Sequence, residues 1–387
     1  MFEQFTTLML QQYWWMIISL LGGCLVFLLF VQGGQSMLYQ AGKSDIERTM
    51  IVNALGHKWE LTFTTLVTFG GAFFASFPLF YATSFGGAYW VWILILFCFI
   101  IQAVSYEFRS KADNLLGSST YEAFLIINGF GATMLLGVVV ATLFTGSEFS
   151  IVTNSDSGLV NPTWEGGFGG LELAFDLSRY TTYINLSLGL AVMFLSRLLG
   201  AMYLRNRIDN EEINKRAMKI IRRETPFFLL FFLFFLANIL VRPGCAYDAA
   251  GLISMEPYKY LHNFIQMPLV GIAFVGGVAG VLAGIAIGGY TKSKSGIYYA
   301  GAGALLAVFA LLLCAGLNDT VYYPATGRYI QNGLTIENSS SGRYTLVVMS
   351  YVSLLVPFVI AYIAYVWRSM DKKRIDKQNI KEESHTY

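Results

Sequence analysis

Charged residues are scarce in this sequence. Only 13% of its 387 residues are Asp, Glu, Lys or Arg, whereas an average soluble domain carries about 25%. Apolar residues make up 55% of the chain, and its mean hydropathy is +0.55. This composition excludes a soluble protein and predicts a protein that crosses a membrane several times. The formal net charge is only +2, which gives no reason to expect nucleic acid as a partner.

Histidine and cysteine are rare as well. The sequence has three histidines, His57, His262 and His385, and four widely separated cysteines. It contains no Cys-x-x-Cys-His motif and no pair of histidines at helical spacing, so the chain cannot hold several haems by histidine ligation. A metal-binding cysteine framework, a nucleotide-binding loop and a catalytic triad are also missing from the sequence. We therefore expect this chain to carry no catalytic, cofactor-binding or metal-binding residue of its own.

Long apolar windows recur along the whole chain. A bilayer core about 30 Å thick needs ~20 apolar residues in a helix. Nine windows meet this need, at residues 13–33, 61–83, 87–106, 122–145, 182–204, 226–242, 264–287, 297–316 and 345–367. Tyr and Trp residues crowd many of their ends, as is typical of membrane interfaces. The predicted fold class is an all-α polytopic membrane protein, with one integral membrane domain over residues 1–387.

Basic residues are unevenly distributed between the loops. If the N-terminus lies outside, 20 of the 26 Lys and Arg residues fall in inner segments, namely 34–60, 107–121, 205–225, 288–296 and 368–387. The positive-inside rule therefore predicts an outer N-terminus and a cytoplasmic tail, 368–387. The outer loops would be 146–181, 243–263 and 317–344. Residues 44–58 alternate apolar and charged side chains, which predicts an amphipathic segment on the inner surface.

Two carboxylates stand at the edges of predicted spans. Glu60 opens the second span and Glu107 closes the third. Because these spans form a hairpin, both carboxylates are expected close together near the inner surface, where they could pass protons. Charges near the bilayer interior cost at least about 2.5–3.5 kcal/mol and are functional candidates by default. The alternative is that both are ordinary interfacial residues, with Glu60 at a helix N-terminus and Glu107 paired to Arg109.

Three other polar residues lie in or beside the spans. Gln32 and Gln35 end the first span, where amides can line a hydrated path or hydrogen-bond between helices. The second role is the commoner one. Arg197 lies within the fifth span and would either snorkel toward the inner surface or pair with a buried acceptor. Of these two, snorkelling is the favoured expectation.

Four short motifs occur between Asp45 and Lys111. They are Glu47-Arg48, Trp59-Glu60, the Gly-Gly-Ala-Phe-Phe-Ala-Ser-Phe-Pro segment at 70–78, and Tyr106-Glu107-Phe108-Arg109. At this spacing the sequence resembles subunit II of the cytochrome bd type quinol oxidases. The resemblance is specific over about the first 110 residues and weaker over the rest of the chain.

The resemblance implies a respiratory complex of the bacterial cytoplasmic (inner) membrane. In that complex, subunit I would carry haem b, haem d and the quinol site, and this chain would be a haem-free scaffold. Quinol would be oxidised, and oxygen reduced to water. Small single-span subunits, membrane lipids and quinone are further expected partners. The nine helices are expected to form two four-helix bundles and one peripheral helix.

The resemblance also implies a proton pathway from the cytoplasm to the oxygen-reducing haem. Glu60 and Glu107 take the places of two family acids, and Tyr387 matches a tyrosine near the channel entrance. Trp59, Arg109, Gln32 and Gln35 are expected to support this pathway. The last two replace acids that the family commonly has at the end of the first span, so they cannot shuttle protons as carboxylates. Gln102 replaces a family Arg, and this puts a structural quinone in this subunit in doubt.

A second function uses the same two acids. A proton- or ion-coupled secondary transporter would need a discontinuous helix with a binding site at the membrane midplane. No charged residue lies deep enough in the predicted spans to coordinate such a substrate.

Overall fold

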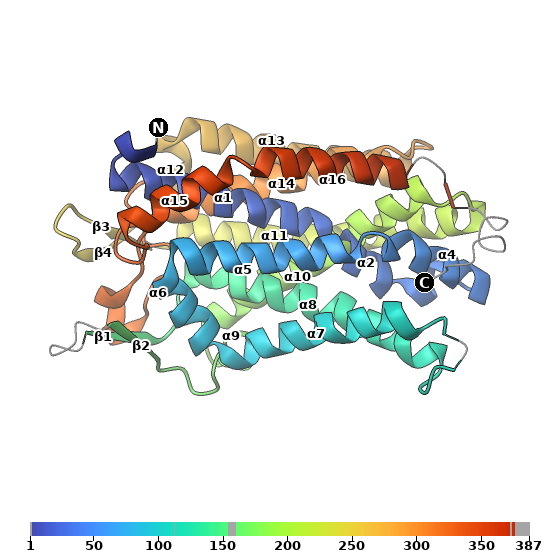
Figure 1. Ribbon diagram of the computed structural model, residues 1–387, viewed down its shortest axis with the longest axis horizontal. Coiled ribbons are helices and arrows are strands. Elements are labelled where there is room, and N and C mark those ends of the chain that lie inside the picture. The colour runs from blue at the N-terminus through green and yellow to red at the C-terminus, as the bar shows by residue number, and fades with distance from the viewer. Residues whose placement is uncertain (1, 112, 154–159, 372–373, 376–387) are drawn as a thin grey trace.

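The computed structural model describes residues 2–111, 113–153, 160–371 and 374–375 of the chain. Its long helices run along one axis, as Figure 1 shows. The first half contains these helices: η1 (Phe2–Gln4), α1 (Thr7–Leu28), α2 (Phe30–Ser36), α3 (Leu38–Ala41), α4 (Asp45–Gly56), α5 (Trp59–Ser76), α6 (Pro78–Phe80), η2 (Tyr81–Phe85), α7 (Tyr89–Phe108) and α8 (Ser118–Thr145). The second half contains α9 (Glu172–Phe175), α10 (Tyr180–Arg207), α11 (Glu211–Val241), α12 (Lys259–Gln266), α13 (Pro268–Tyr290), α14 (Gly296–Gly316), η3 (Gly327–Asn332), α15 (Arg343–Ser353) and α16 (Val356–Met370).

The predicted all-α membrane fold is confirmed. Among the described residues, eight helices are long and apolar enough to cross a membrane, and a ninth is added if one bent pair counts as a span. That pair corresponds to the predicted span 61–83. Its first helix ends at Ser76, and the chain bends by 116° before the next helical segment begins at Pro78. Pro78 opens the next turn, where its missing N–H costs nothing.

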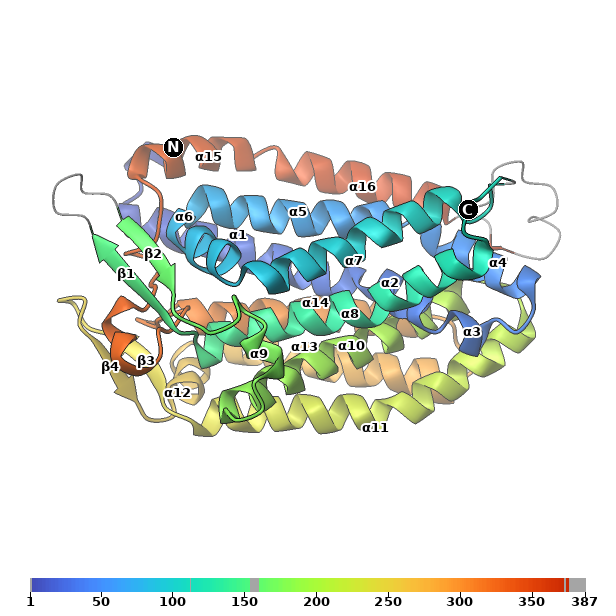
Figure 2. The ribbon, with the colours of Figure 1, turned by 90° about the horizontal axis from the view of Figure 1, so that it is seen from below.

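The spans pack as two groups of four with a ninth at the side. The first group contains α1–α2, α5, α7 and α8, and the second contains α10, α11, α13 and α14. Helix α10 joins the groups by packing on both α2 and α8. Glycines allow the closest approach, since a Cβ at Gly284 would lie 2.5 Å from the Cβ of Ala300. Helices α15 and α16 lie at the edge of the structure (Figure 2), and only α15 packs closely on α1 and α5.

Two β-hairpins lie together at one end of the bundle, which we call the hairpin end (Figures 1 and 2). Strand β1 (Phe149–Thr153) pairs with β2 (Val160–Trp164), and β3 (Gly244–Tyr247) pairs with β4 (Ile253–Glu256), both antiparallel. Single bridges join Ser147 to Ala325 and Ala246 to Thr320. The three loops predicted to lie outside therefore form one connected cap.

The opposite end, which we call the basic end, carries α4 and the connections α7–α8, α10–α11 and α13–α14 (Figure 2). Helix α4 begins with a capping box, in which the Ser44 side chain accepts from the Glu47 backbone and the Glu47 side chain accepts from the Ser44 backbone. The predicted amphipathic segment 44–58 does form this helix. Its apolar face is buried within the chain, where Met50, Ile51 and Leu55 are fully covered.

Candidate functional site

Glu60 and Glu107 lie at the basic end, on neighbouring helix termini. Glu60 is in the first turn of α5, where the positive end of the helix dipole favours a carboxylate, and Glu107 is in the last turn of α7. The residues just before them, Trp59 and Tyr106, stack with ring centroids 5.8 Å apart and planes 9° apart. This stack holds the two helix ends side by side, and both glutamates are exposed.

The two exposed carboxylates differ in their partners. Glu107 forms an ion pair with Lys111 at 3.1 Å, and both side chains are more than half exposed. Glu60 has no hydrogen-bond or ion-pair partner among the described residues. The alternative expectation of a Glu107–Arg109 pair is wrong, because the Arg109 guanidinium pairs with Glu122, 2.7 Å away.

Glu122 is a site residue that sequence reasoning missed. Its side chain is only 1% exposed and accepts hydrogen bonds from Arg109 Nη2 at 2.7 Å and Nε at 3.2 Å. Arg48 Nε lies 3.1 Å from its second oxygen. Burial together with this carboxylate raises the pKa of the nearby Tyr39 hydroxyl. The sequence did contain a signal for this residue. Glu122 is the first residue of the predicted span 122–145, much as Glu60 directly precedes the predicted span 61–83.

Buried amides form a network beside this ion pair. Gln32 Nε2 donates to Gln102 Oε1 at 3.3 Å, and Gln102 Nε2 donates to Gln35 Oε1 at 3.1 Å. The Tyr106 hydroxyl donates to the same Gln35 oxygen at 3.0 Å, and Gln35 Nε2 donates to Asn128 Oδ1. Gln32 and Gln35 thus form hydrogen bonds between helices, which is the commoner of the two roles expected for them. Gln32 Oε1 and Asn128 Nδ2 are buried without a partner among the described residues.

Glycine allows the helices around this network to meet. A Cβ at Gly129 of α8 would lie 2.5 Å from the backbone oxygen of Gln32, and one at Gly33 would overlap the backbone of Ser196 in α10. The absence of side chains at these two positions brings α2 against both neighbours. As a result, the amides of α2 can reach Asn128 on α8.

Arg197 does not snorkel, and that expectation is wrong. Its side chain is 2% exposed and forms a two-armed ion pair with Glu224, with Nε 2.7 Å and Nη2 2.6 Å from the two carboxylate oxygens. Ser36 and Gln40 accept its remaining hydrogen bonds. The acceptor was overlooked because the span was expected to start at residue 226. Helix α11 instead begins at Glu211, and its early turns carry Glu224 inside the fold.

The residue before Trp59 is a buried lysine. Lys58 is fully covered, and its ammonium lies 3.3 Å from the Asp371 carboxylate and 4.6 Å from the centroid of the Trp367 ring. Arg207 Nε lies 3.5 Å from the same carboxylate. The start of α5 is thus fastened to the end of α16. Tyr387, the third predicted pathway residue, lies outside the described residues.

The histidines of the described residues do not fit a haem. His57 caps α4 at the basic end, and His262 Nδ1 lies 2.9 Å from the Glu256 carboxylate at the hairpin end. Within the described ranges, no group of three or more His, Cys, Asp and Glu residues could hold a metal ion.

The family of the chain is decided by its match over nearly its whole length. Residues 10–370 match the family described as cytochrome bd terminal oxidase subunit II. The chain belongs to this family. It is therefore the second subunit of a cytochrome bd terminal oxidase, and the family resemblance expected from residues 45–111 is confirmed.

Curated relatives of this oxidase subunit match along almost their full length. The probable cytochrome oxidase subunit 2 of Haemophilus influenzae is 25% identical, over 96% of this chain and 97% of the relative. The cytochrome bd-I ubiquinol oxidase subunit 2 of Escherichia coli is 24% identical over the same shares. The cytochrome bd ubiquinol oxidase subunit 2 of Bacillus subtilis is 25% identical, over 92% and 94%.

A solved structure shares the fold. The bd oxidase from Geobacillus thermodenitrificans contains a chain that matches with a TM-score of 0.52 and 14% identity, over 93% of this chain and 95% of that one. The fold of this subunit is thus also found in a chain of that oxidase.

Proposed function

We propose that this bd oxidase subunit conducts protons from the basic end toward its haem-bearing partner, with Glu60 and Glu107 as the entry residues. The observation that carries the proposal is the pair of exposed carboxylates on the joined ends of α5 and α7. At the same end, the interior glutamates Glu122 and Glu224 are paired to arginine.

A residue that passes protons must bind and release them in each cycle. A carboxylate held by two arginines stays ionised, because the neighbouring positive charges favour its charged form. Glu122 is in this position, between Arg109 and Arg48. Glu60 has no such partner, and the exposed Glu107–Lys111 pair is of the weak kind that salt and water screen. Both side chains are therefore open to solvent, and no strong ion pair among the described residues holds them.

The amide network supplies the next part of the pathway. Tyr106 immediately precedes Glu107 in the sequence and stacks on Trp59. Its hydroxyl donates a hydrogen bond to Gln35. Amides cannot carry a proton as carboxylates do, but they hold water in place. The free acceptor of Gln32 and the free donor of Asn128 are the kind of buried groups that bind ordered water. In this proposal such water passes the proton inward, and Tyr387 adds to the entrance.

The complex is a quinol oxidase, of which this chain is a component. Two relatives are named ubiquinol oxidase subunits. The substrate of this complex is accordingly a quinol, oxidised while oxygen is reduced to water. Haem b and haem d lie in the partner, subunit I, and small single-span subunits and lipids complete the assembly. In this proposal the chain scaffolds the partner and delivers protons to it.

The basic end faces the cytoplasm in this proposal. It carries the connections in which Lys and Arg are concentrated, including Arg48, Arg205, Arg216 and Arg222, as the positive-inside rule requires. The N-terminus and the hairpin end are then outside a bacterial inner membrane, and residues 368–387 form the cytoplasmic tail. The proton entry residues lie on the side from which respiratory oxidases of this type would draw their protons.

The test measures oxygen consumption by the purified complex with Glu60→Gln or Glu107→Gln. We expect each to lower quinol-driven turnover by about tenfold, less than the ~10²-fold effect of a proton-transfer group at the reacting atoms. Asp45→Asn is the matched control, because Asp45 is another exposed carboxylate at the same end, paired only with Arg48. Wild-type turnover in both glutamate variants, with the haem spectrum unchanged, would refute the proposal. The break of the second span between α5 and α6 lies near the hairpin end (Figure 2), whereas a secondary transporter would need a break at the membrane midplane.

A further inference from the structure

The hairpin end contains a second feature that the proton pathway does not use. A cavity of about 410 Å³ lies where the ends of α8, α10 and α11 meet the loops that follow them. This volume falls in the range of small-molecule sites. Its lining is largely apolar and includes the buried side chains Phe144, Ile184, Ile239 and Tyr260.

One cation lines this cavity without an opposing acid. Arg242 follows the last residue of α11, and its guanidinium lies 5.7 Å from the centroid of the Tyr180 ring. Its side chain forms no hydrogen bond or ion pair with any described residue. No Asp or Glu is among the described residues that line the cavity. A partly buried guanidinium that no carboxylate of the described lining neutralises is a favourable site for an anion.

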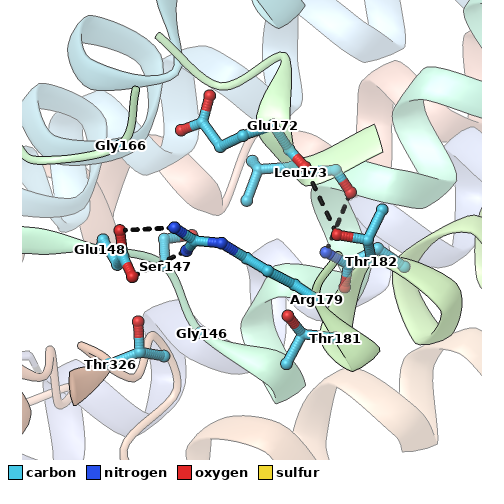
Figure 3. Close-up of a pocket in the computed structure, with 11 residues that line it drawn as sticks. Gly146, Ser147, Glu148, Gly166, Glu172, Leu173, Arg179, Thr181, Thr182 and Thr326 are labelled. Carbon is cyan, nitrogen blue, oxygen red and sulfur yellow. Dashed lines mark hydrogen bonds and ion pairs between the residues drawn. The ribbon is translucent and has the colours of Figure 1, made fainter. Parts of the chain in front are cut away.

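A neighbouring pocket contains another arginine of the hairpin end, and the surroundings of that arginine differ from those of Arg242. This smaller cavity of about 30 Å³ shares Thr181 and Thr326 with the larger one (Figure 3). There, Arg179 points at Glu148, with 2.7 Å between the charged atoms, and also pairs with Asp176 at 2.8 Å. The charge of Arg179 is satisfied within the chain, whereas that of Arg242 is not. The two cavities therefore differ in their capacity to take an anionic ligand.

The position of Arg242 indicates what kind of anion can reach it. The apolar run of α11 ends at Val241, which is 64% exposed, so Arg242 stands at the depth where lipid headgroups lie. Tyr180 is also exposed, as is usual for aromatic residues at a membrane interface. A ligand with a phosphate at headgroup depth and an apolar body fits both the cation and the lining.

We propose that an anionic phospholipid binds in this cavity, with its phosphate on the Arg242 guanidinium and an acyl chain against Phe144, Ile184 and Ile239. Arginine binds phosphate through two parallel hydrogen bonds. The hydroxyls of Thr181 and Thr326 offer partners for the glycerol of the headgroup. The ammonium of a zwitterionic headgroup would find no carboxylate there, so the site selects phosphatidylglycerol over phosphatidylethanolamine.

The test uses the purified oxidase complex after delipidation in mild detergent. Dioleoyl phosphatidylglycerol and dioleoyl phosphatidylethanolamine are titrated separately, and bound lipids are counted by native mass spectrometry. We expect the wild-type complex to retain one tightly bound phosphatidylglycerol, which Arg242→Gln binds about tenfold more weakly. Arg328→Gln is the matched control, because Arg328 lies exposed at the same end outside the lining and contacts only Tyr329. This variant should bind lipid as the wild type does.

A second variant tests the cavity with the charge left in place. Thr326→Phe puts a ring into the lining, and we expect it also to lose the tightly bound phosphatidylglycerol. If Arg242→Gln prevents assembly of the complex, the outcome for Thr326→Phe decides. Equal phosphatidylglycerol binding by the wild type and either variant would overturn the proposal. Equal binding of phosphatidylethanolamine to the wild type would overturn the selectivity for an anionic lipid.

Discussion

Two sets of glutamates at the basic end differ in almost every physical respect. Glu60 and Glu107 are exposed on the ends of α5 and α7. Among the described residues, their one ion pair is the weak pair between Glu107 and Lys111. Glu122 and Glu224 are buried and each is held by arginine through more than one hydrogen bond. The same residue type can therefore pass protons at the surface and fasten helices in the interior, depending on whether a cation holds it.

The buried pairs are expected to give the largest effect on stability. In Glu122→Gln, Arg109 and Arg48 lose their shared carboxylate, and the buried guanidinium of Arg109 loses its ion pair with Glu122. Breaking one side of a buried pair typically costs about 3–5 kcal/mol. We expect this variant to assemble poorly with the partner subunit, as measured by the yield of intact complex from membranes. A normal yield with normal thermal stability would contradict a structural role of Glu122.

The amide network is expected to give an intermediate effect. Gln35→Leu removes the acceptor oxygen of Gln102 Nε2 and one hydrogen bond of the Tyr106 hydroxyl. Each buried group that loses its partner costs about 1–3 kcal/mol. We expect the purified complex to unfold at a lower temperature in a thermal scan, and its turnover to fall as well. The control is Gln35→Glu, which keeps the acceptor oxygen and should retain more of the turnover.

The exposed pair is expected to give the smallest effect on stability. Lys111→Ala removes the ion-pair partner of Glu107, in a geometry where such pairs contribute about 0.3–0.5 kcal/mol. The unfolding temperature of the complex should therefore stay near that of the wild type. Turnover should also stay close to normal, because Glu107 keeps its carboxylate. A large loss of stability would show that the exposed Glu107–Lys111 pair stabilises the fold as strongly as the buried glutamate–arginine pairs do.

The spans could be predicted because apolar length is a local property of the sequence. Eight of them appear near the expected ranges as helical spans long and apolar enough to cross a membrane. The interruption at Phe77 and Pro78 was harder to foresee, because the apolar run continues through it to residue 83 and hides the 116° bend. The early start of α11 was missed for the opposite reason. Its first turns are rich in charged residues, most of them exposed, so no apolar run marks this part of the helix in the sequence.

The partners of the charged residues could not be predicted from the sequence. Arg197 and Glu224 are 27 positions apart, and Lys58 meets Asp371 from the other end of the chain. Such pairs depend on how helices pack, which spacing alone does not reveal. The nearness of the α5 and α7 ends could be predicted, since the hairpin of the second and third spans places these ends at equal depth, and the Trp59–Tyr106 stack joins them. That expectation needed only span lengths and the turn between them.

The most direct test of the account measures proton uptake during a single turnover. The reduced complex with Glu60→Gln and Glu107→Gln together is mixed with oxygen, and a pH-indicator dye follows the protons taken from solution. The account predicts proton uptake slower than wild type by about tenfold or more, while the complex assembles normally and the first electron transfer keeps its rate. Proton uptake at the wild-type rate would contradict the central claim that these two exposed carboxylates admit protons to the oxidase.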